Sequence, residues 1–128
     1  MPVAITNQIQ IEVETSYNGE QQDDDKLCRM FVYRIRISNL GDCTVKLLRR
    51  HWLIIDPLDG DMEVEGEGVV GQQPVLEPGE TFRYVSGCAL NSTIGRMKGT
   101  YQMERLIDGK VIEVQIPAFD LVAPYQLN

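Results

Sequence analysis

Residues 31–38 read Phe31-Val32-Tyr33-Arg34-Ile35-Arg36-Ile37-Ser38, and a large apolar side chain occupies every odd position. Successive side chains of a β-strand point to opposite faces of its sheet, so this alternation places one set in a core and the other in solvent. We therefore expect the segment to form a half-buried strand.

A second alternating segment precedes it. Its apolar positions are Ile9, Ile11, Val13 and Tyr17, which alternate with Gln10, Glu12, Glu14 and Ser16. The residues from Asn18 to Lys26 are polar and show no apolar period, which predicts a loop across the surface. The run Asp23-Asp24-Asp25 within this stretch is typical of a solvated surface.

The segment from Val45 to Ile55 carries apolar residues at odd and even positions alike, which predicts a central strand or a strand with a bulge. A turn at Asn39-Leu40-Gly41-Asp42 separates this segment from residues 31–38. We expect the two strands to be neighbours in one sheet.

Turn signals divide the rest of the chain into short segments. Asp59-Gly60 precedes an alternating stretch at Met62-Glu63-Val64-Glu65. Pro78-Gly79 stands at the centre of a predicted type II turn, because proline restrains its own φ and glycine accepts a positive φ. About seven or eight short strands and no convincing amphipathic helix result. The pattern predicts an all-β fold, an antiparallel β-sandwich.

The dipeptide Asp108-Gly109 predicts a tight two-residue hairpin turn. This turn pairs Met103 with Val114 and Tyr101 with Ile116, whereas a three-residue loop would set Met103 against Gln115. The same register sets Glu104 opposite Glu113, which is unfavourable unless solvent screens the two charges.

Composition indicates one globular domain over residues 1–128, with 43% hydrophobic and 24% charged residues. The formal net charge of -7 argues against nucleic acid or an acidic membrane as a nonspecific partner. The N-terminus lacks the pattern of a secretory signal, and no stretch approaches the roughly 20 apolar residues of a membrane-spanning helix. We expect a cytoplasmic protein.

The three cysteines, Cys28, Cys43 and Cys88, form no C-x-x-C pair of the kind that binds zinc. We interpret them as buried thiols in a reducing compartment.

The string from Gly66 to Gly71 satisfies G-x-G-x-x-G, the phosphate loop of dinucleotide-binding folds. That mechanism needs a helix after the loop, but Gln72, Gln73 and Pro74 lead into another strand. Glu67 also places a carboxylate where an anion would sit. A glycine-rich backbone can still offer N–H groups to phosphate without a helix, so Gly66, Glu67, Gly68 and Gly71 remain candidate ligand-binding residues.

The string Arg49-Arg50-His51-Trp52 joins two arginines to the chain's only histidine and only tryptophan. Alternation places Arg49 and His51 on one face and Arg50 and Trp52 on the other. We expect Trp52 in the core and the arginines paired with carboxylates, with a partner-binding role for Arg49, Arg50 and His51 as the alternative. His51 has no motif-bearing nucleophile beside it, and Cys88 is the one candidate, so no catalytic residue is assigned.

Acidic residues crowd the stretch from Asp56 to Glu67, and Glu63, Glu65 and Glu67 share one predicted strand face. Oxygen-rich clusters can hold Mg²⁺ or Ca²⁺, but the spacing of a calcium loop is absent. A solvated acidic edge that discourages aggregation is the commoner explanation, so these glutamates are weak metal candidates and no cofactor is expected.

Taken together, these strings resemble the ApaG family, also labelled as proteins associated with cobalt and magnesium efflux. The resemblance spans almost the whole chain and rests on the following strings: Asn39-Leu40-Gly41, Val45, Leu47-Leu48, Arg50-His51-Trp52, Glu63-Val64, Gly66-Glu67-Gly68-Val69-Val70-Gly71, Gln73-Pro74, Leu76, Pro78-Gly79-Glu80, Phe82, Tyr84, Ser86-Gly87-Cys88, Gly95, Met97, Gly99, Tyr101-Gln102-Met103 and Ile116-Pro117-Ala118-Phe119.

The resemblance implies a fibronectin type III-like, immunoglobulin-like sandwich without an established enzymatic activity. It also implies an interaction domain, since the family's module is appended to eukaryotic F-box and polymerase-interacting proteins. We therefore expect a non-catalytic module that binds a protein partner, with a homodimer through an edge strand as one form of this. The alternatives are a sensor of pyrophosphate or nucleotide phosphate at Gly66–Gly71 and a protein of cobalt and magnesium homeostasis.

Overall fold

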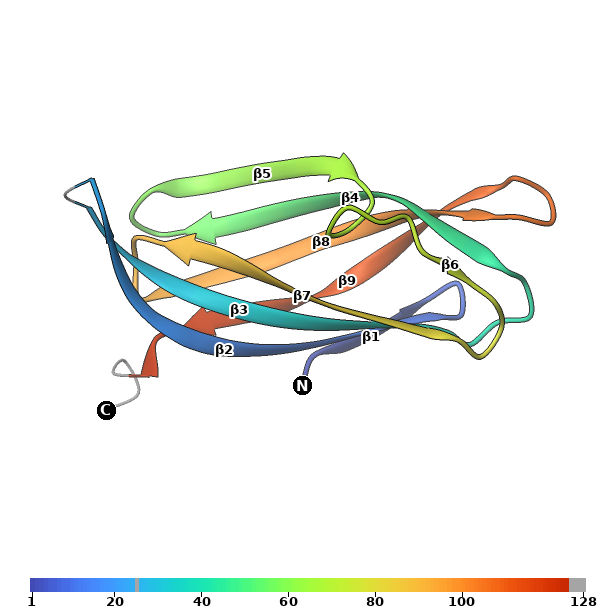
Figure 1. Cartoon of the computed structure of the whole chain (residues 1–128), viewed down its shortest axis with the longest axis horizontal. Coiled ribbons are helices and arrows are strands. Elements are labelled where there is room, and N and C mark those ends of the chain that lie inside the picture. The colour runs from blue at the N-terminus through green and yellow to red at the C-terminus, as the bar shows by residue number, and fades with distance from the viewer. Residues whose placement is uncertain (25, 125–128) are drawn as a thin grey trace.

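The computed structural model describes residues 1–24 and 26–124, which form two antiparallel sheets packed face to face (Figure 1). The nine strands are β1 (Val3–Thr6), β2 (Ile9–Asp23), β3 (Lys26–Asn39), β4 (Val45–Asp56), β5 (Gly60–Glu67), β6 (Val75–Leu76), β7 (Thr81–Leu90), β8 (Ile94–Arg105) and β9 (Val111–Val122). Sheet A has the order β1-β2-β3-β7, and sheet B has the order β5-β4-β8-β9 with β6 paired to β4. The predicted antiparallel β-sandwich is confirmed.

The core lies between the sheets and is built from the residues that strand parity assigned to it. In β3 the side chains of Phe31, Tyr33, Ile35 and Ile37 are buried, whereas Arg34 and Arg36 are exposed. Its centre is an aromatic cluster in which the ring of Trp52 lies 5.5 Å from that of Tyr33 and 5.9 Å from that of Phe119, centroid to centroid. Because these rings come from β3, β4 and β9, the cluster joins the two sheets.

The predicted surface loop from Asn18 to Lys26 is wrong, because β2 and β3 continue through it as a long hairpin. The register shifts between Tyr17 and Glu20, and Gln21 then pairs with Cys28. This part of the hairpin extends past the core, so most of its side chains lie in solvent on either face and no apolar period marks it. Of the predicted solvated acidic run, Asp24 is exposed and Asp25 lies outside the described residues.

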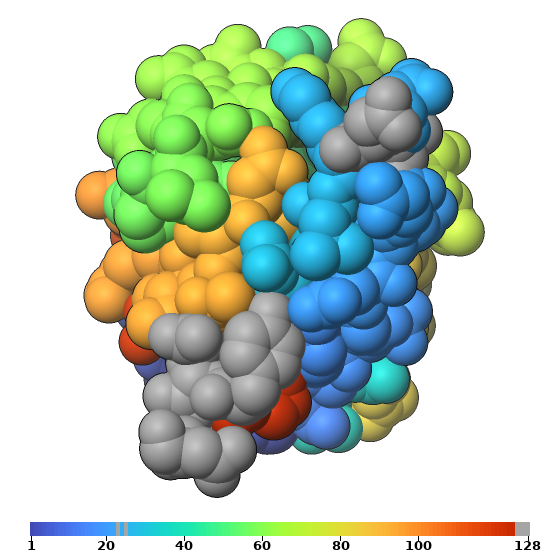
Figure 2. All heavy atoms as spheres, turned by 90° about the vertical axis from the view of Figure 1, so that its left-hand side faces the viewer, coloured from blue at the N-terminus to red at the C-terminus, as the bar shows by residue number. Residues whose placement is uncertain are grey.

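Figure 2 views the molecule from the end that carries this hairpin. The blue strands of sheet A stand on one side, and the green and orange strands of sheet B stand on the other. The hairpin therefore belongs to one layer only.

The predicted pairing of residues 31–38 with the strand that begins at Val45 is also wrong, because β3 belongs to sheet A and β4 to sheet B. The buried side chain of Asn39 holds the crossover between them. Its amide donates to the carbonyls of Cys43 at 2.8 Å and Leu76 at 3.0 Å, and its oxygen accepts from the N–H of Gly41. These bonds direct the chain into the other sheet, where β4 takes the predicted central place with a bulge between Leu47 and Arg49.

The β8–β9 hairpin has a longer turn than predicted. The backbone N–H of Arg105 donates to the carbonyl of Lys110 at 2.8 Å, so residues 106–109 form the loop. Met103 therefore pairs with Ile112 rather than with Val114. A shift by two positions keeps every side chain on its face, so parity could not distinguish these registers. The expected clash of Glu104 with Glu113 is absent, because Glu104 pairs with Val111 and Gln102 with Glu113.

The other two turns form as predicted. Asp56 pairs with Gly60 at the end of the β4–β5 hairpin. Gly79 has a φ of 87°, and Glu80 donates to the carbonyl of Glu77 at 2.9 Å, as a type II turn requires. No helix among the described residues is long and apolar enough to cross a membrane.

Candidate binding surfaces

Strand β7 is an edge of sheet A, and its outer side pairs with no other strand of the described chain. It pairs with β3 on one side only, over the ten residues Thr81–Leu90. Its side chains alternate strictly, with Tyr84 and Cys88 buried and Arg83 and Val85 exposed. It contains no proline, and its ladder with β3 has no register shift. A long, regular edge of this kind presents unpaired N–H and C=O groups to a further strand.

The remaining edges are protected in different ways. In sheet A, β1 has only four residues, and Gln115 of β9 donates its N–H to the hydroxyl of Thr6 at 3.2 Å. In sheet B, β9 is interrupted by Pro117 and by a register shift of its pairing with β8. Strand β5 exposes the carboxylates of Glu63, Glu65 and Glu67. Short length, proline, bulges and like charges all hinder the addition of another strand.

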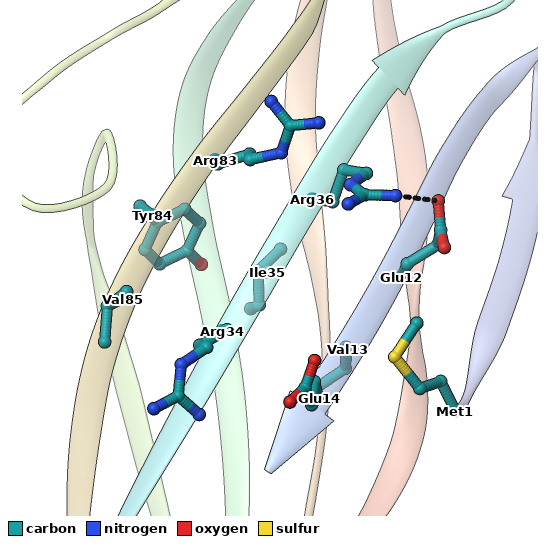
Figure 3. A pocket seen from close by; sticks show the side chains of 10 residues that line it. All are labelled: Met1, Glu12, Val13, Glu14, Arg34, Ile35, Arg36, Arg83, Tyr84 and Val85. Carbon is teal, nitrogen blue, oxygen red and sulfur yellow. Dashed lines mark ion pairs between the residues drawn. The ribbon is translucent and has the colours of Figure 1, made fainter.

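The outer face of β3 and β7 carries three arginines, Arg34, Arg36 and Arg83, which we call the arginine face (Figure 3). Figure 3 shows them on neighbouring strands, with Glu12 and Glu14 of β2 on the side away from β7. They line a depression of about 240 Å³ to which Val85 and Met1 contribute apolar surface. Arginine and methionine are among the residue types enriched in protein interfaces.

Cross-strand register explains how the charges of this face are distributed. Glu12 lies opposite Arg36, and Arg36 lies opposite Arg83. Arg36 forms an ion pair with Glu12 at 3.7 Å, whereas Arg83 has no ion pair or hydrogen bond among the described residues. Arg36 and Arg83 carry like charges directly opposite each other and repel. A negative charge placed beside Arg83, on the side away from Arg36, would therefore be favourable.

The string Gly66–Gly71 ends β5 and forms a turn without a following helix. Gly68, Val70 and Gly71 all have positive φ, and Val69 exchanges two hydrogen bonds with Gln72. The N–H of Gly68 donates to the carbonyl of Leu48 at 2.9 Å. Three amides of the turn thus already bind carbonyls of the protein, and the phosphate-binding role of this loop stays a prediction.

Arg50 lies beneath this loop. Its Nη1 donates to the carbonyls of Glu67 at 3.0 Å and Gly68 at 2.9 Å, rather than to the carboxylates that we expected. A Cβ at Gly66 would stand 2.9 Å from this Nη1, so the guanidinium occupies the space that the missing side chain leaves. The arginine and the glycines therefore form one structural unit.

A cavity of about 310 Å³ opens between the sheets below the same loop. Tyr33, Trp52 and Met97 form its buried floor, and the exposed residues Val70 and Gly87 stand at its rim. Further hydroxyls come from Ser86 and from Tyr84, whose hydroxyl is hydrogen-bonded to that of Tyr101. The cavity joins the glycine loop of sheet B to the β7 edge of sheet A.

Burial controls the protonation of the groups in this cavity. Burial raises the pKa of Tyr33, although a hydrogen bond with Ser86 and the charge of Arg50 act in the opposite direction. Burial also raises the pKa of the Cys88 thiol to about 11, with a smaller contribution from the charge of Asp56. Cys88 is therefore protonated at neutral pH, whereas a nucleophilic cysteine needs its thiolate.

His51 lies away from this cavity, on the outer face of sheet B. Its Nε2 is 3.4 Å from a carboxylate oxygen of Glu63 and 3.7 Å from one of Glu65. Arg49 is exposed nearby, at the same depression as Glu65. The predicted face assignment of these side chains and the core position of Trp52 are confirmed, but His51 and the glycine-loop amides do not share a pocket.

Within residues 1–24 and 26–124, no group of three or more histidine, cysteine or acidic side chains is arranged to hold a metal ion. Asp56, at the start of the acidic stretch, is buried and binds protein groups instead. Its carboxylate accepts from the hydroxyl of Ser92 at 2.7 Å, the N–H of Asn91 at 2.9 Å and the N–H of Leu58 at 3.0 Å. Asp56 therefore ties the β4–β5 turn to the β7–β8 turn.

Of the three cysteines, Cys88 is buried as predicted, while Cys28 and Cys43 are half-buried, and all three are free. Sequence reasoning missed the arginine face. Parity placed Arg34 and Arg36 on an outer face, but nothing in the sequence shows that Arg83 lies directly across from Arg36. That proximity depends on the pairing of strands far apart in the chain.

The chain matches the sequence profile of the ApaG domain over residues 19–105. The chain belongs to the ApaG family. A curated ApaG protein from Thiobacillus denitrificans is 46% identical over 121 residues, 94% of each chain. One from Anaeromyxobacter dehalogenans is 41% identical over 128 residues and covers both chains fully. These ApaG relatives carry names that state no enzymatic activity.

Solved structures agree with this assignment. A crystal structure of the ApaA protein from Bordetella pertussis is 41% identical, covers 96% of each chain and superposes with a TM-score of 0.82. The two-sheet architecture described above is thus shared with a solved relative of this chain.

Proposed function

We propose that this protein is a non-catalytic binding module whose β7 edge and arginine face dock an extended, acidic segment of a partner protein. The observation that supports this most directly is the combination of one unprotected edge strand with an arginine, Arg83, that has no partner among the described residues. In strand addition, main-chain hydrogen bonds supply affinity and alternate side chains supply specificity.

The charges of the arginine face define the partner's side chains. A strand added beside β7 would place one residue opposite Arg83 and another, two positions away on the same face, opposite Val85. An acidic residue complements the first position and an apolar residue the second. The module therefore favours a segment in which acidic and apolar residues alternate on one strand face.

The absence of a catalytic role is part of this proposal. Of the two candidate groups, His51 faces glutamates on the outer face of sheet B and the protonated Cys88 lines the cavity between the sheets. The two side chains lie at different places, so His51 cannot act as a base for Cys88. The free cysteines are typical of a reducing compartment, and we place the module in the cytoplasm on that ground.

The test uses a synthetic peptide with glutamate and valine alternating on one strand face and threonine on the other, together with a copy that has lysine for glutamate. We expect the acidic peptide to bind and the lysine peptide not to bind, as measured by fluorescence anisotropy. Arg83→Glu should weaken binding by about tenfold or more, because the attraction between Arg83 and a peptide glutamate becomes a repulsion between two carboxylates. Lys98→Glu, at an exposed cation of sheet B without an ion pair among the described residues, is the matched charge control.

Hydrogen exchange distinguishes strand addition from simple charge attraction. The edge N–H groups of β7 should become protected when the acidic peptide binds, because they gain main-chain partners. Equal binding of the lysine peptide, or binding without protection of β7, would contradict the proposal. Protection of β7 at high protein concentration without peptide would identify a second copy of this chain as the occupant and would also overturn it.

A further inference from the structure

The cavity beneath the glycine loop has the size and enclosure of a small-ligand site. Its volume of about 310 Å³ lies at the lower end of the range of about 300–1,000 Å³ that ligand pockets span. Tyr33 and Trp52 in its floor expose only 6% and 3% of their surface, while Val70 at its rim exposes 49%. A compact molecule could enter between the glycine loop and β7 and reach a largely apolar floor.

The charge of this cavity is unbalanced. Among the described residues that line it, Arg50 is the one charged side chain, and no carboxylate faces it there. The bonds from Nη1 to the Glu67 and Gly68 carbonyls hold the guanidinium in place, and no further hydrogen-bond partner of Arg50 occurs among the described residues. A partly buried cation that binds only neutral carbonyls is better stabilised when an anion joins it.

The other walls define which anion fits. The Tyr84 hydroxyl is bonded to that of Tyr101, and the Tyr33 hydroxyl to that of Ser86. A hydroxyl that accepts such a bond keeps its own proton for a ligand oxygen, so each pair can offer one donor to the cavity. Trp52, Ile54 and Met97 bring apolar surface. A phosphate would need donors for all of its charged oxygens, yet the Gly68, Val69 and Gln72 amides are already bonded to carbonyls. One guanidinium with a few hydroxyls matches a carboxylate, which has two oxygens.

We propose that this cavity binds a small organic carboxylate, with its two oxygens at Arg50 and the neighbouring hydroxyls and its apolar body against Trp52, Ile54 and Met97. The ligand is compact, because the cavity volume lies at the lower end of the range for ligand pockets. The proposal is independent of the binding of an acidic segment at β7, since none of the three arginines of that face lines the cavity.

The test is a titration of the ¹⁵N-labelled full chain with three probes of increasing apolar size, acetate, isobutyrate and benzoate. The probes are taken to about 10 mM, because a compact ligand in a fitting site binds in the millimolar range or more tightly. We expect at least one carboxylate to shift the Trp52 indole signal and the amides of Gly71 and Ser86. Benzamide, the neutral counterpart of benzoate, should bind at least about tenfold more weakly.

Two variants locate the ligand. Ser86→Leu adds apolar bulk on the inner side of β7, at the cavity, and should abolish the shifts. Ala89→Leu adds the same bulk to the outer face of the same strand and is the matched control, with binding unchanged. Arg50→Gln should lower the affinity by about tenfold or more, and circular dichroism checks that the loop it supports remains folded.

The proposal is overturned if all three carboxylates leave the Trp52, Gly71 and Ser86 signals unchanged, if benzamide binds as well as benzoate, or if binding survives Ser86→Leu. Inorganic phosphate serves as a further arm, and equal shifts by phosphate would show general anion binding and contradict a carboxylate site. Arg83→Glu should leave carboxylate binding intact, so that failure of the β7 proposal and failure of this one are distinguishable.

Discussion

At the scale of single residues, buried polar side chains explain why the connections of this fold run where they do. Asn39 satisfies two carbonyls and one amide at the crossover between the sheets. At the other end of β4, the Asp56 carboxylate accepts hydrogen bonds from two turns and holds them together. Removing either group would leave buried partners without hydrogen bonds, which costs more than the bond itself contributes.

Asp56 makes stability depend on pH in a defined direction. Burial alone would raise the pKa of its carboxyl, but hydrogen bonds from Ser92, Asn91, Leu58 and Asp59 outweigh burial and hold the pKa below its ordinary value. The ionised form is therefore favoured in the folded state. Its contribution is fully present above the unfolded pKa of about 3.9 and is lost as pH falls through the lower folded pKa.

We predict that Asp56→Asn lowers the free energy of unfolding by about 1–3 kcal/mol at pH 7 and that the difference from wild type shrinks below about pH 4. Urea unfolding at pH 7 and pH 3 measures both values. Asp61→Asn, at an exposed carboxylate of β5, is the control and should change little at either pH. A deficit of Asp56→Asn that is equal at the two pH values would contradict this account.

At the scale of strands, close backbone approach sets where β8 can pair with β4. Gly99 lies opposite Trp52 in this ladder and at the register shift between β8 and β9. A Cβ at Gly99 would lie 2.2 Å from the carbonyl oxygen of His51, which is backbone and cannot turn aside. Gly87 on β7 is different, because the nearest atom to its Cβ would be the Phe31 oxygen at 3.3 Å.

Gly99→Ala is therefore expected to destabilise the protein by about 1–3 kcal/mol or more, because β8 must move away from β4 to admit the methyl group. Gly87→Ala is the matched substitution on another strand and should cost less than about 1 kcal/mol. Thermal unfolding followed by far-ultraviolet circular dichroism compares the two. Equal melting temperatures for both variants would show that the β4–β8 contact is looser than described.

At the scale of the whole molecule, the two sheets are held together through the aromatic cluster of Tyr33, Trp52 and Phe119. Phe119 is 3% exposed, and its ring touches residues of both sheets. Phe119→Ala should lower the free energy of unfolding by about 3–5 kcal/mol, as expected when a large buried aromatic ring is removed. Ile107→Ala, at a hairpin tip where the side chain is 77% exposed, should have almost no effect.

Because the cluster joins the sheets, they should unfold together. The fluorescence of Trp52, the only tryptophan, and the far-ultraviolet circular dichroism signal should change at the same urea concentration in wild type and in Phe119→Ala. Separate transitions would mean that each sheet is stable alone, which would contradict a single core.

Much of the fold was predictable, because the alternation of Phe31, Tyr33, Ile35 and Ile37 and the turn at Pro78-Gly79 are local properties of the chain. Such patterns assign each side chain to a face and mark where strands end. They also placed Trp52 in the core and Glu63, Glu65 and Glu67 on one exposed face. The resemblance to the ApaG family rested on other strings, among them Arg50-His51-Trp52 and Gly66–Gly71, and the profile match over residues 19–105 shows the membership.

Which strands pair, and in which register, depended on the tertiary structure. Parity is unchanged by a shift of two positions, so it could not place Met103 opposite Ile112, and it carries no information on whether β4 follows β3 in one sheet or crosses to the other. Those choices rest on hydrogen bonds and packing between residues far apart in sequence. The meeting of Arg36 with Arg83 and the cavity above Trp52 are products of such contacts, because each joins strands that no local pattern connects.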